Sequence, residues 1–264
     1  LFPAEATTTL RDDAVAALFW VANWAFVAQK TDYFAQGSPP SPLQHTWSLG
    51  VEEQYYLFWP LLVLAVAAVF GARARWGVFA LATVGAAGSA VAAILLASDA
   101  EVNRVYFGTD ARVQALLVGA AAAALLVCDW SVLTTGGTLI RTRWRRWSAG
   151  ALSVLGLAML AALTHYATGS ARDFRTGLLI VVALAAVLVV APVALDQGGP
   201  VARALAWRPL VWLGAISYGV YLWHWPIFLA LNGERTGWSG WRLFALRGAG
   251  TVAVAAAAGW RRVQ

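Results

Sequence analysis

Ser41-Pro42-Leu43-Gln44-His45-Thr46-Trp47-Ser48-Leu49-Gly50-Val51-Glu52-Glu53-Gln54-Tyr55-Tyr56-Leu57-Phe58-Trp59-Pro60 is the stretch that decides the fold, and it runs on into the apolar residues 61–70. It places a histidine, two adjacent acids and several aromatic residues at the entrance of a segment suited to a membrane. Ionisable groups at such a position are rare and usually belong to a site. The stretch therefore predicts both a membrane helix and a polar site.

The composition of the whole chain supports a membrane protein. Of its 264 residues, 60% are hydrophobic and 12% are charged, against about 25% charged in an average soluble domain. The net charge is +6 and the pI is near 10.0. The arginines lie in short loops between apolar runs, so topology and anionic lipid headgroups explain them better than nucleic acid does.

Apolar stretches of about 20 residues are long enough to cross a bilayer as helices. We expect an all-α, polytopic transmembrane helix bundle with about seven full spans, at roughly 54–70, 77–97, 113–128, 148–166, 177–195, 209–231 and 242–260. A weaker stretch at 14–28 is either a short span or a re-entrant segment. Small residues at 85–89 are expected to let helices approach closely, and Pro60 and Pro226 are expected to kink their spans.

The arginine distribution predicts the orientation. The loops 71–76 and 129–147 carry six arginines and one acid, and two spans separate these loops. The positive-inside rule makes that side cytoplasmic. The start of the helix that carries Glu52 and the loop 106–112 then face outward.

Three stretches together resemble the acyltransferase 3 family, whose members are multi-pass membrane enzymes that O-acylate sugars and cell-envelope polymers. They are His45–Pro60 (HTWSLGVEEQYYLFWP), Tyr106–Arg112 (YFGTDAR) and Leu213–Pro226 (LGAISYGVYLWHWP). The resemblance implies one acyltransferase-type domain over 1–264 in the plasma membrane. It also implies transfer of an acyl group, usually acetyl, from acyl-CoA to a hydroxyl of a glycan or glycoside, with no bound cofactor.

The resemblance also implies elements that this sequence lacks. The family's catalytic histidine follows an arginine by about ten residues in the first membrane helix, and a Glu-x-Pro-x-Arg motif commonly closes the domain. His45, His165 and His224 have no arginine in that setting, and at residues 260–264 the chain stops before the closing motif or departs from it. The chain starts at Leu1. We therefore expect a fragment that lacks the first membrane helices and is inactive alone.

The resemblance makes Glu52, Glu53 and His45 the candidate catalytic residues, with the carboxylates orienting a base or exchanging a proton. An alternative is that the acids lie in the first helical turn, capped by Ser48, where they complement the helix dipole. The alternative for His45 is a structural role in the loop that precedes the helix. His224 is expected to make a hydrogen bond in helix packing, and His165 to lie at the membrane interface.

Further side chains are candidates for binding substrate: Trp47, Ser48, Gln54, Tyr56, Tyr106, Asp110 and Arg112. Asp110 and Arg112 could instead form a structural ion pair with each other or with the Glu52–Glu53 pair. Trp47 and Trp59 could stack on a sugar or anchor the chain at the interface. The spacing of His, Cys and acidic residues predicts no metal site, and Cys128, the single cysteine, excludes an internal disulfide.

Two other functions stay open. A secondary transporter would show an internal repeat with paired broken helices, and no repeat is visible in the sequence. A non-catalytic membrane sensor or binding module could use the same scaffold. The basic residues Arg141, Arg143, Arg145 and Arg146 set topology, bind anionic lipid or contact the phosphates of coenzyme A.

Overall fold

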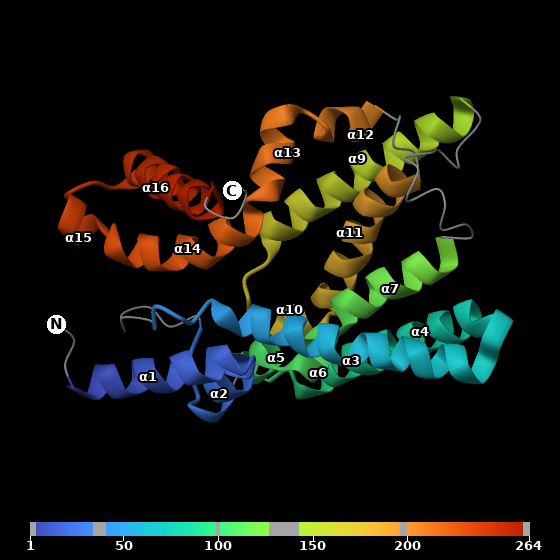
Figure 1. The fold of residues 1–264 in the computed structure, drawn as a ribbon, viewed down its shortest axis with the longest axis horizontal. Coiled ribbons are helices and arrows are strands. Elements are labelled where there is room, and N and C mark those ends of the chain that lie inside the picture. Colours follow the sequence, from blue (N-terminus) through green and yellow to red (C-terminus); the bar gives the residue numbers. More distant parts are fainter. Residues whose placement is uncertain (1–3, 34–40, 99–100, 127–142, 196–199, 261–264) are drawn as a thin grey trace. The chain divides into compact units, whose positions relative to one another are not determined.

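The computed structural model describes residues 4–33, 41–98, 101–126, 143–195 and 200–260. Within these ranges every regular element is a helix, as expected from the sequence. They are α1 (Ala4–Leu18), α2 (Ala22–Ala28), α3 (Thr46–Phe70), η1 (Gly71–Arg73), α4 (Ala74–Leu96), α5 (Val102–Phe107), α6 (Thr109–Arg112), α7 (Gln114–Leu126), α9 (Arg143–Tyr166), α10 (Ala171–Arg175), α11 (Leu178–Leu195), α12 (Pro200–Leu205), α13 (Arg208–Ala215), α14 (Ser217–Ala230), α15 (Gly233–Thr236) and α16 (Gly240–Trp260) (Figure 1).

The chain divides into two compact units. The first comprises Leu1–Ala25, Gly37–Gly50 and Ala206–Gln264, and the second comprises Phe26–Gln36 and Val51–Leu205. Helix α3 begins in the first unit and continues in the second.

Helices α4, α7, α9 and α11 form the centre of the second unit. Helix α7 packs against both α4 and α11, and α11 packs against α9 (Figure 1). A side-chain carbon at Gly85 would lie 3.0 Å from Leu117 Cδ1, and Ser89 Oγ accepts a hydrogen bond of 3.1 Å from the Gln114 backbone N–H. The predicted close approach of helices at 85–89 is therefore confirmed.

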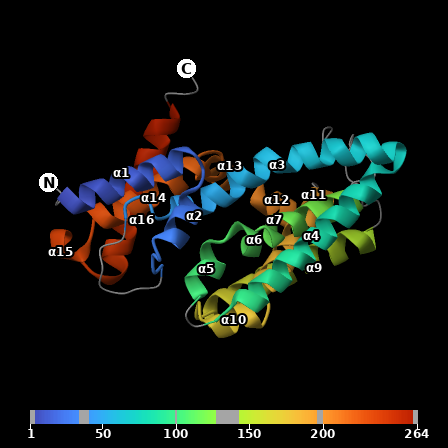
Figure 2. The ribbon, with the colours of Figure 1, turned by 90° about the horizontal axis from the view of Figure 1, so that it is seen from below.

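The chain reverses between α3 and α4 at η1, as Figure 2 shows. Gly71 has φ +50°, a conformation that side chains disfavour. On the far side of the turn, a Cβ at Gly77 would lie only 2.6 Å from Val66 Cγ1. Glycine at both positions allows the two apolar helices to follow one another through a short turn.

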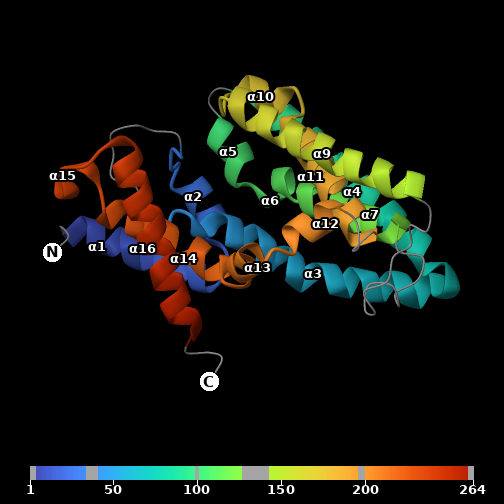
Figure 3. The same ribbon diagram turned by 90° about the horizontal axis from the view of Figure 1, so that it is seen from above.

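In the first unit, α14 packs along α16 (Figures 1 and 3). Gly219 lies against Ala255, so that an added Cβ would be 3.3 Å from the alanine Cβ. Small residues at this crossing bring the two backbones together, which is the usual way that membrane helices associate.

Three described segments are long and apolar enough to cross a membrane: Thr46–Leu96, Trp147–Tyr166 and Leu178–Leu195. The first is 51 residues long and contains α3, η1 and α4. Two predicted segments are divided in the structure. The stretch 209–231 breaks at Ile216 between α13 and α14, and the stretch 14–28 breaks at Trp20, which has φ +57°. The count of about seven spans stays a prediction.

Candidate functional site

Helix α14 holds the turn that precedes α3. The Tyr221 hydroxyl donates to the His45 carbonyl oxygen at 2.7 Å, and one turn later the Trp225 indole N–H donates to the Ser41 carbonyl oxygen at 2.9 Å. Side chains four positions apart lie on the same face of a helix. This face of α14 therefore fixes both ends of the turn 41–45.

His45 is buried by this arrangement, with 6% of its surface exposed. Its ring centroid lies 5.4 Å from that of His224 and 5.7 Å from that of Tyr221. The backbone groups of Pro42 and Leu222 interact with the ring and oppose part of its pKa shift, although neither ring nitrogen makes a hydrogen bond of good geometry to a described residue. Burial, and then the neighbouring His224, lower the pKa of His45 from 6.5 to about 4. The imidazole is therefore neutral at pH 7.

Hydrogen bonds fix the protonation of the neighbouring groups. His224 Nδ1 contacts the Tyr221 carbonyl oxygen, and because a carbonyl only accepts, Nδ1 is the donor. The Tyr221 hydroxyl uses its own proton on the His45 carbonyl, so the Ser48 hydroxyl, which contacts it, donates to the Tyr221 oxygen. The predicted helix-packing role of His224 is thus replaced by a bond within its own helix.

Gly50 is the reason that α3 can pass close to the break between α1 and α2. A Cβ at this position would lie 2.9 Å from Asn23 Oδ1 and 3.1 Å from the Trp20 carbonyl oxygen. Asn23 is fully buried, so its side chain has little room to move. Packing against Asn23 and Trp20 therefore requires a glycine at position 50.

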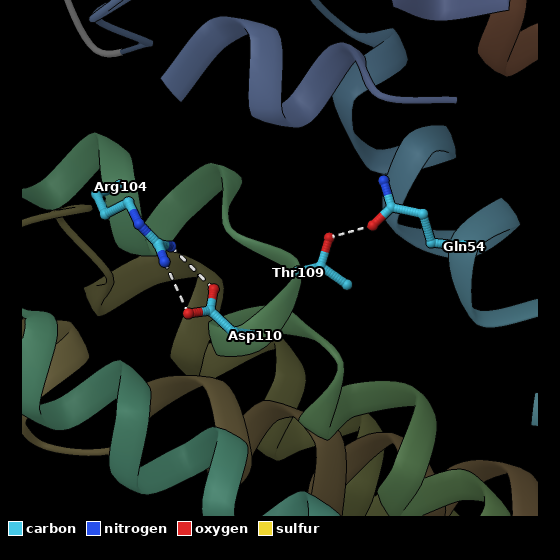
Figure 4. Close-up of polar contacts among 4 residues, drawn as sticks. All are labelled: Gln54, Arg104, Thr109 and Asp110. Carbon is cyan, nitrogen blue, oxygen red and sulfur yellow. Dashed lines mark hydrogen bonds and ion pairs between the residues drawn. The ribbon is translucent and has the colours of Figure 1, made fainter. Parts of the chain in front are cut away.

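In the second unit, Arg104 and Asp110 form a two-point ion pair across Gly108, with N···O distances of 2.9 and 2.7 Å (Figure 4). The bonds from Arg104 hold the pKa of Asp110 below its usual range. A Cβ at Gly108 would lie 2.0 Å from Arg104 Nη1. The predicted pairing of Asp110 with Arg112, or with the Glu52–Glu53 pair, is wrong, because α5 and α6 turn around Gly108 and bring Arg104 to Asp110.

Arg112 instead binds Tyr106. Its Nε donates to the Tyr106 carbonyl oxygen at 2.8 Å, and its guanidinium carbon lies 4.4 Å from the centroid of the Tyr106 ring. Tyr33 stacks on Tyr106 at 4.3 Å, and the Tyr33 backbone N–H donates to Asn103 Oδ1 at 3.0 Å. Tyr106 and Arg112 therefore help to hold the segment that precedes residue 34.

Gln54 connects two of the stretches singled out in the sequence. The Thr109 hydroxyl donates to Gln54 Oε1 at 2.6 Å (Figure 4). This contact brings the start of α6 to α3 within the second unit. The sequence pointed to Gln54 and Asp110 as site residues but not to Thr109 or Arg104. A threonine and an arginine in short helices on either side of Gly108 give no signal of their own.

Glu52 and Glu53 are both half-buried. Neither makes a hydrogen bond or an ion pair with another described residue. The alternative that places them in the first turn of their helix is wrong, because α3 begins at Thr46 and its first turn holds no acid. Ser48 is likewise inside the helix and does not cap it.

The described cavity of about 410 Å³ lies along α7 and α11 in the second unit. Alanine, glycine, valine and leucine alone line it. It offers a surface for hydrocarbon and no group for acid–base chemistry. Polar groups in the described part of the chain include the His45–His224–Tyr221 cluster in the first unit and the side chains around Gln54 in the second.

Comparison with known proteins identifies the family. Residues 14–260 match the Acyltransferase domain family. The chain belongs to this family. The acyltransferase chain is 32% identical over 231 residues to YrhL of Bacillus subtilis and 32% identical over 228 residues to the peptidoglycan O-acetyltransferase OatA of Listeria monocytogenes. It is 30% identical over 232 residues to the O-acetyltransferase OatA of Staphylococcus aureus.

These alignments cover 86–88% of the acyltransferase chain but only 35–37% of each relative. The chain thus spans about a third of the length of these curated relatives. No solved structure matches it.

The remaining residues that the sequence singled out in the acyltransferase chain differ in exposure. Tyr56 is exposed, with 56% of its surface accessible, and Trp47 is half-buried. Trp59 stacks on Tyr55 at 5.4 Å and packs against the apolar core of the second unit, so it is a packing residue. His165 is exposed near the end of α9. Arg141 and the side chains of Arg143, Arg145 and Arg146 lie outside what the structure describes.

Proposed function

We propose that this chain contributes to acyl transfer in the plasma membrane, within a multi-pass domain that moves an acetyl group from acyl-CoA to a hydroxyl of a cell-envelope glycan. The observation that carries the proposal is the family match over residues 14–260. Two relatives named as O-acetyltransferases, one of them of peptidoglycan, support the glycan acceptor. The three apolar segments support the membrane setting.

The proposed reaction needs a base and a polar environment for an oxyanion. The base removes the proton of the acceptor hydroxyl, whose oxygen attacks the thioester carbonyl carbon. The new C–O bond forms as the C–S bond breaks, and the thiolate of coenzyme A takes up the proton. Donors aimed at the carbonyl oxygen stabilise the charge that develops there.

We assign roles to this chain's residues within that reaction. Glu52 and Glu53 are half-buried carboxylates that make no ion pair with a described residue. We assign them the role of orienting substrate groups or exchanging protons with them. His45 is a buried imidazole whose pKa lies below the ordinary value. Gln54 is positioned by Thr109, whereas Tyr106, Asp110 and Arg112 are engaged in contacts that hold the loop and act by positioning.

A chimera tests the proposal. Residues 14–260 replace the matching region of the Listeria monocytogenes relative, and the chimera is expressed in a host strain that lacks its own peptidoglycan O-acetyltransferase. We expect base-labile acetate on the peptidoglycan. The Glu52→Gln and Glu53→Gln variants should lose most of it, while Glu234→Gln, an exposed acid in α15, should retain it.

The proposal is contradicted if the chimera is present in the membrane at normal abundance but the peptidoglycan carries no acetate. Uptake of labelled sugar into vesicles, without transfer, would instead favour the transporter. The 264-residue chain alone is expected to transfer no acyl group, since it lacks the arginine–histidine element that the family resemblance implies. Acetate transfer by the 264-residue chain in proteoliposomes would refute the expectation that it is inactive alone.

A further inference from the structure

Arg247 is a charged residue of the first unit to which the proposed reaction gives no role. It is half-buried in α16, within the stretch 242–260 that the sequence predicts to cross the membrane. An ionisable side chain in such a segment is costly, and it usually belongs to a site or reaches a partner at the membrane surface. The contacts of its guanidinium group therefore indicate what it binds.

One edge of the guanidinium is held by the protein. Its Nε donates a hydrogen bond of 2.8 Å to the Leu231 carbonyl oxygen, at the C-terminal end of α14, where a positive charge is favoured. The guanidinium carbon lies 5.2 Å from the centroid of the Phe228 ring, within the range of a cation–π contact. Because α14 packs along α16, these contacts fix the group at the end of the helix pair.

The positive charge of Arg247 is not neutralised within the described ranges. No carboxylate of a described residue lies within ion-pair distance of it. A guanidinium has five N–H donors, and the hydrogen bond to Leu231 uses only the one on Nε. The donors on Nη1 and Nη2 make no hydrogen bond to a described residue. The side chain is partly exposed, so a ligand can reach these donors without a buried cavity.

The residues around this end of the helix pair resemble a membrane interface. Arg235 and Arg242 are exposed there and are opposed by a single acid, Glu234. Trp238 and Trp241 are 47% and 83% exposed. Tryptophan is enriched where membrane helices meet lipid headgroups, and arginine side chains near helix ends extend to the same region. An excess of positive charge at that depth favours an anionic group of a headgroup.

We propose that Arg247 binds a phosphate group through its Nη1 and Nη2 donors. The planar fork of a guanidinium matches two oxygens of a phosphate. A lipid headgroup and a soluble phosphate offer the same chemistry, and the exposed tryptophans favour the headgroup as its source. The bound phosphate would hold the end of α14, whose Tyr221 and Trp225 fix the turn 41–45. The proposal rests on the contacts of α14 and α16 and not on the acyl-transfer reaction.

The test titrates the 264-residue chain, in an uncharged maltoside detergent, with three probes: phosphatidylglycerol, inorganic phosphate and an uncharged diacylglycerol. The midpoint of thermal unfolding and the lipid retained in native mass spectrometry are measured for each. In Arg247→Gln the amide can still donate to the Leu231 carbonyl, so the helix contact is kept while the charge is removed. Arg247→Lys keeps the charge without the fork. The matched control is Arg172→Gln, which replaces an exposed arginine of α10 in the second unit.

We expect phosphatidylglycerol to raise the unfolding midpoint of the unmodified chain in a saturable way. Arg247→Gln should weaken the apparent affinity about tenfold, because the charge-assisted hydrogen bonds are lost, and Arg247→Lys should lie between the two. Arg172→Gln should bind like the unmodified chain, and diacylglycerol should have no effect. A response to phosphatidylglycerol but not to inorganic phosphate identifies a headgroup as the source, and an Arg247-dependent response to both identifies a site for any phosphate.

The proposal is overturned if Arg247→Gln binds phosphatidylglycerol and inorganic phosphate as tightly as the unmodified chain. It is also overturned if Arg172→Gln weakens binding as much, or if diacylglycerol reproduces the effect. If Arg247→Gln does not fold, Arg247→Lys decides the outcome. An ammonium group cannot make the two-point contact of a guanidinium, so unchanged affinity in that variant would contradict binding through Nη1 and Nη2.

Discussion

The Tyr221 hydroxyl donates a hydrogen bond of 2.7 Å to the carbonyl oxygen of His45, 176 residues earlier in the chain. This bond joins the last of the three recognised stretches to the first. It determines where the turn before α3 lies on α14, and with it the position of the buried imidazole.

Replacing Tyr221 by Phe removes this bond and leaves the Ser48 hydroxyl without its partner. Because both partners are at least half-buried, we expect a loss of about 1–3 kcal/mol in the free energy of unfolding, measured by denaturation in a mild detergent. The matched control is Tyr218→Phe on the same helix. Tyr218 is 57% exposed, and its replacement should be neutral. Equal effects of the two substitutions would argue against the bond.

Gly50→Ala should destabilise the first unit. The added methyl meets Asn23 Oδ1 at 2.9 Å and the Trp20 carbonyl at 3.1 Å, where backbone atoms cannot move freely. We expect a loss of about 1–3 kcal/mol, the range for overpacking. Gly248→Ala in α16 is the control, since nothing lies within 4 Å of its added Cβ. It should be neutral or stabilising. Thermal unfolding of the two variants, compared with the unmodified chain, measures the difference in stability.

The folded protein should lose stability on mild acidification through His45. Its pKa of about 4 lies below the unfolded value of 6.5, so the unfolded chain binds a proton that the folded chain does not. The contribution is fully present above pH 6.5 and is lost as the pH falls from 6.5 towards 4. Unfolding curves over this window should show the slope. His45→Gln should reduce it, and His165→Gln should leave it unchanged.

The Arg104–Asp110 pair should contribute little to stability, because both side chains are partly exposed, at 22% and 42%. Double-mutant cycles with Arg104→Gln and Asp110→Asn should give a coupling of about 0.2–1 kcal/mol. The depressed pKa of Asp110 means that this coupling is present above the unfolded pKa. It disappears as the pH falls through the lower folded value. A coupling that survives full protonation would contradict the ion-pair origin.

Thr109→Val should weaken the attachment of α6 to α3. The substitution keeps the shape but removes the 2.6 Å bond to Gln54, at an expected cost of about 0.5–1.5 kcal/mol. Thr83→Val is the control, since the Thr83 hydroxyl bonds only to the Phe79 carbonyl of its own helix and is exposed. Limited proteolysis between α4 and α5 should accelerate in the first variant alone.

Most of the helical segments could be predicted, because lipid selects long runs of apolar residues. The stretch 177–195 corresponds to α11 within one residue. The predicted helix boundaries were wrong where local contacts extend a helix beyond its apolar run. The predicted span from residue 54 begins eight residues earlier, at Thr46, whose hydroxyl donates to the Leu43 carbonyl at 2.7 Å. This extension moved Glu52 and Glu53 out of the first turn.

The site could be predicted in its residue types but only partly in its contacts. Gln54 and Asp110 were named, and each has a defined partner. Their partners, Arg104 in the six-residue helix α5 and Thr109 in the four-residue helix α6, were not predicted, because side chains next to the turn at Gly108 meet these neighbours only after the turn forms. His224 was expected to bond across helices, yet its Nδ1 turns back to Tyr221 of its own helix.

The sequence by itself determined the helical class, the membrane character of the apolar runs and the three stretches that mark the acyltransferase family. Composition and spacing are enough for these, since they depend on local hydrophobicity and residue order. Only the tertiary structure decided that His45 is buried beside His224. That outcome depends on hydrogen bonds between residues more than 170 positions apart, which no local pattern encodes.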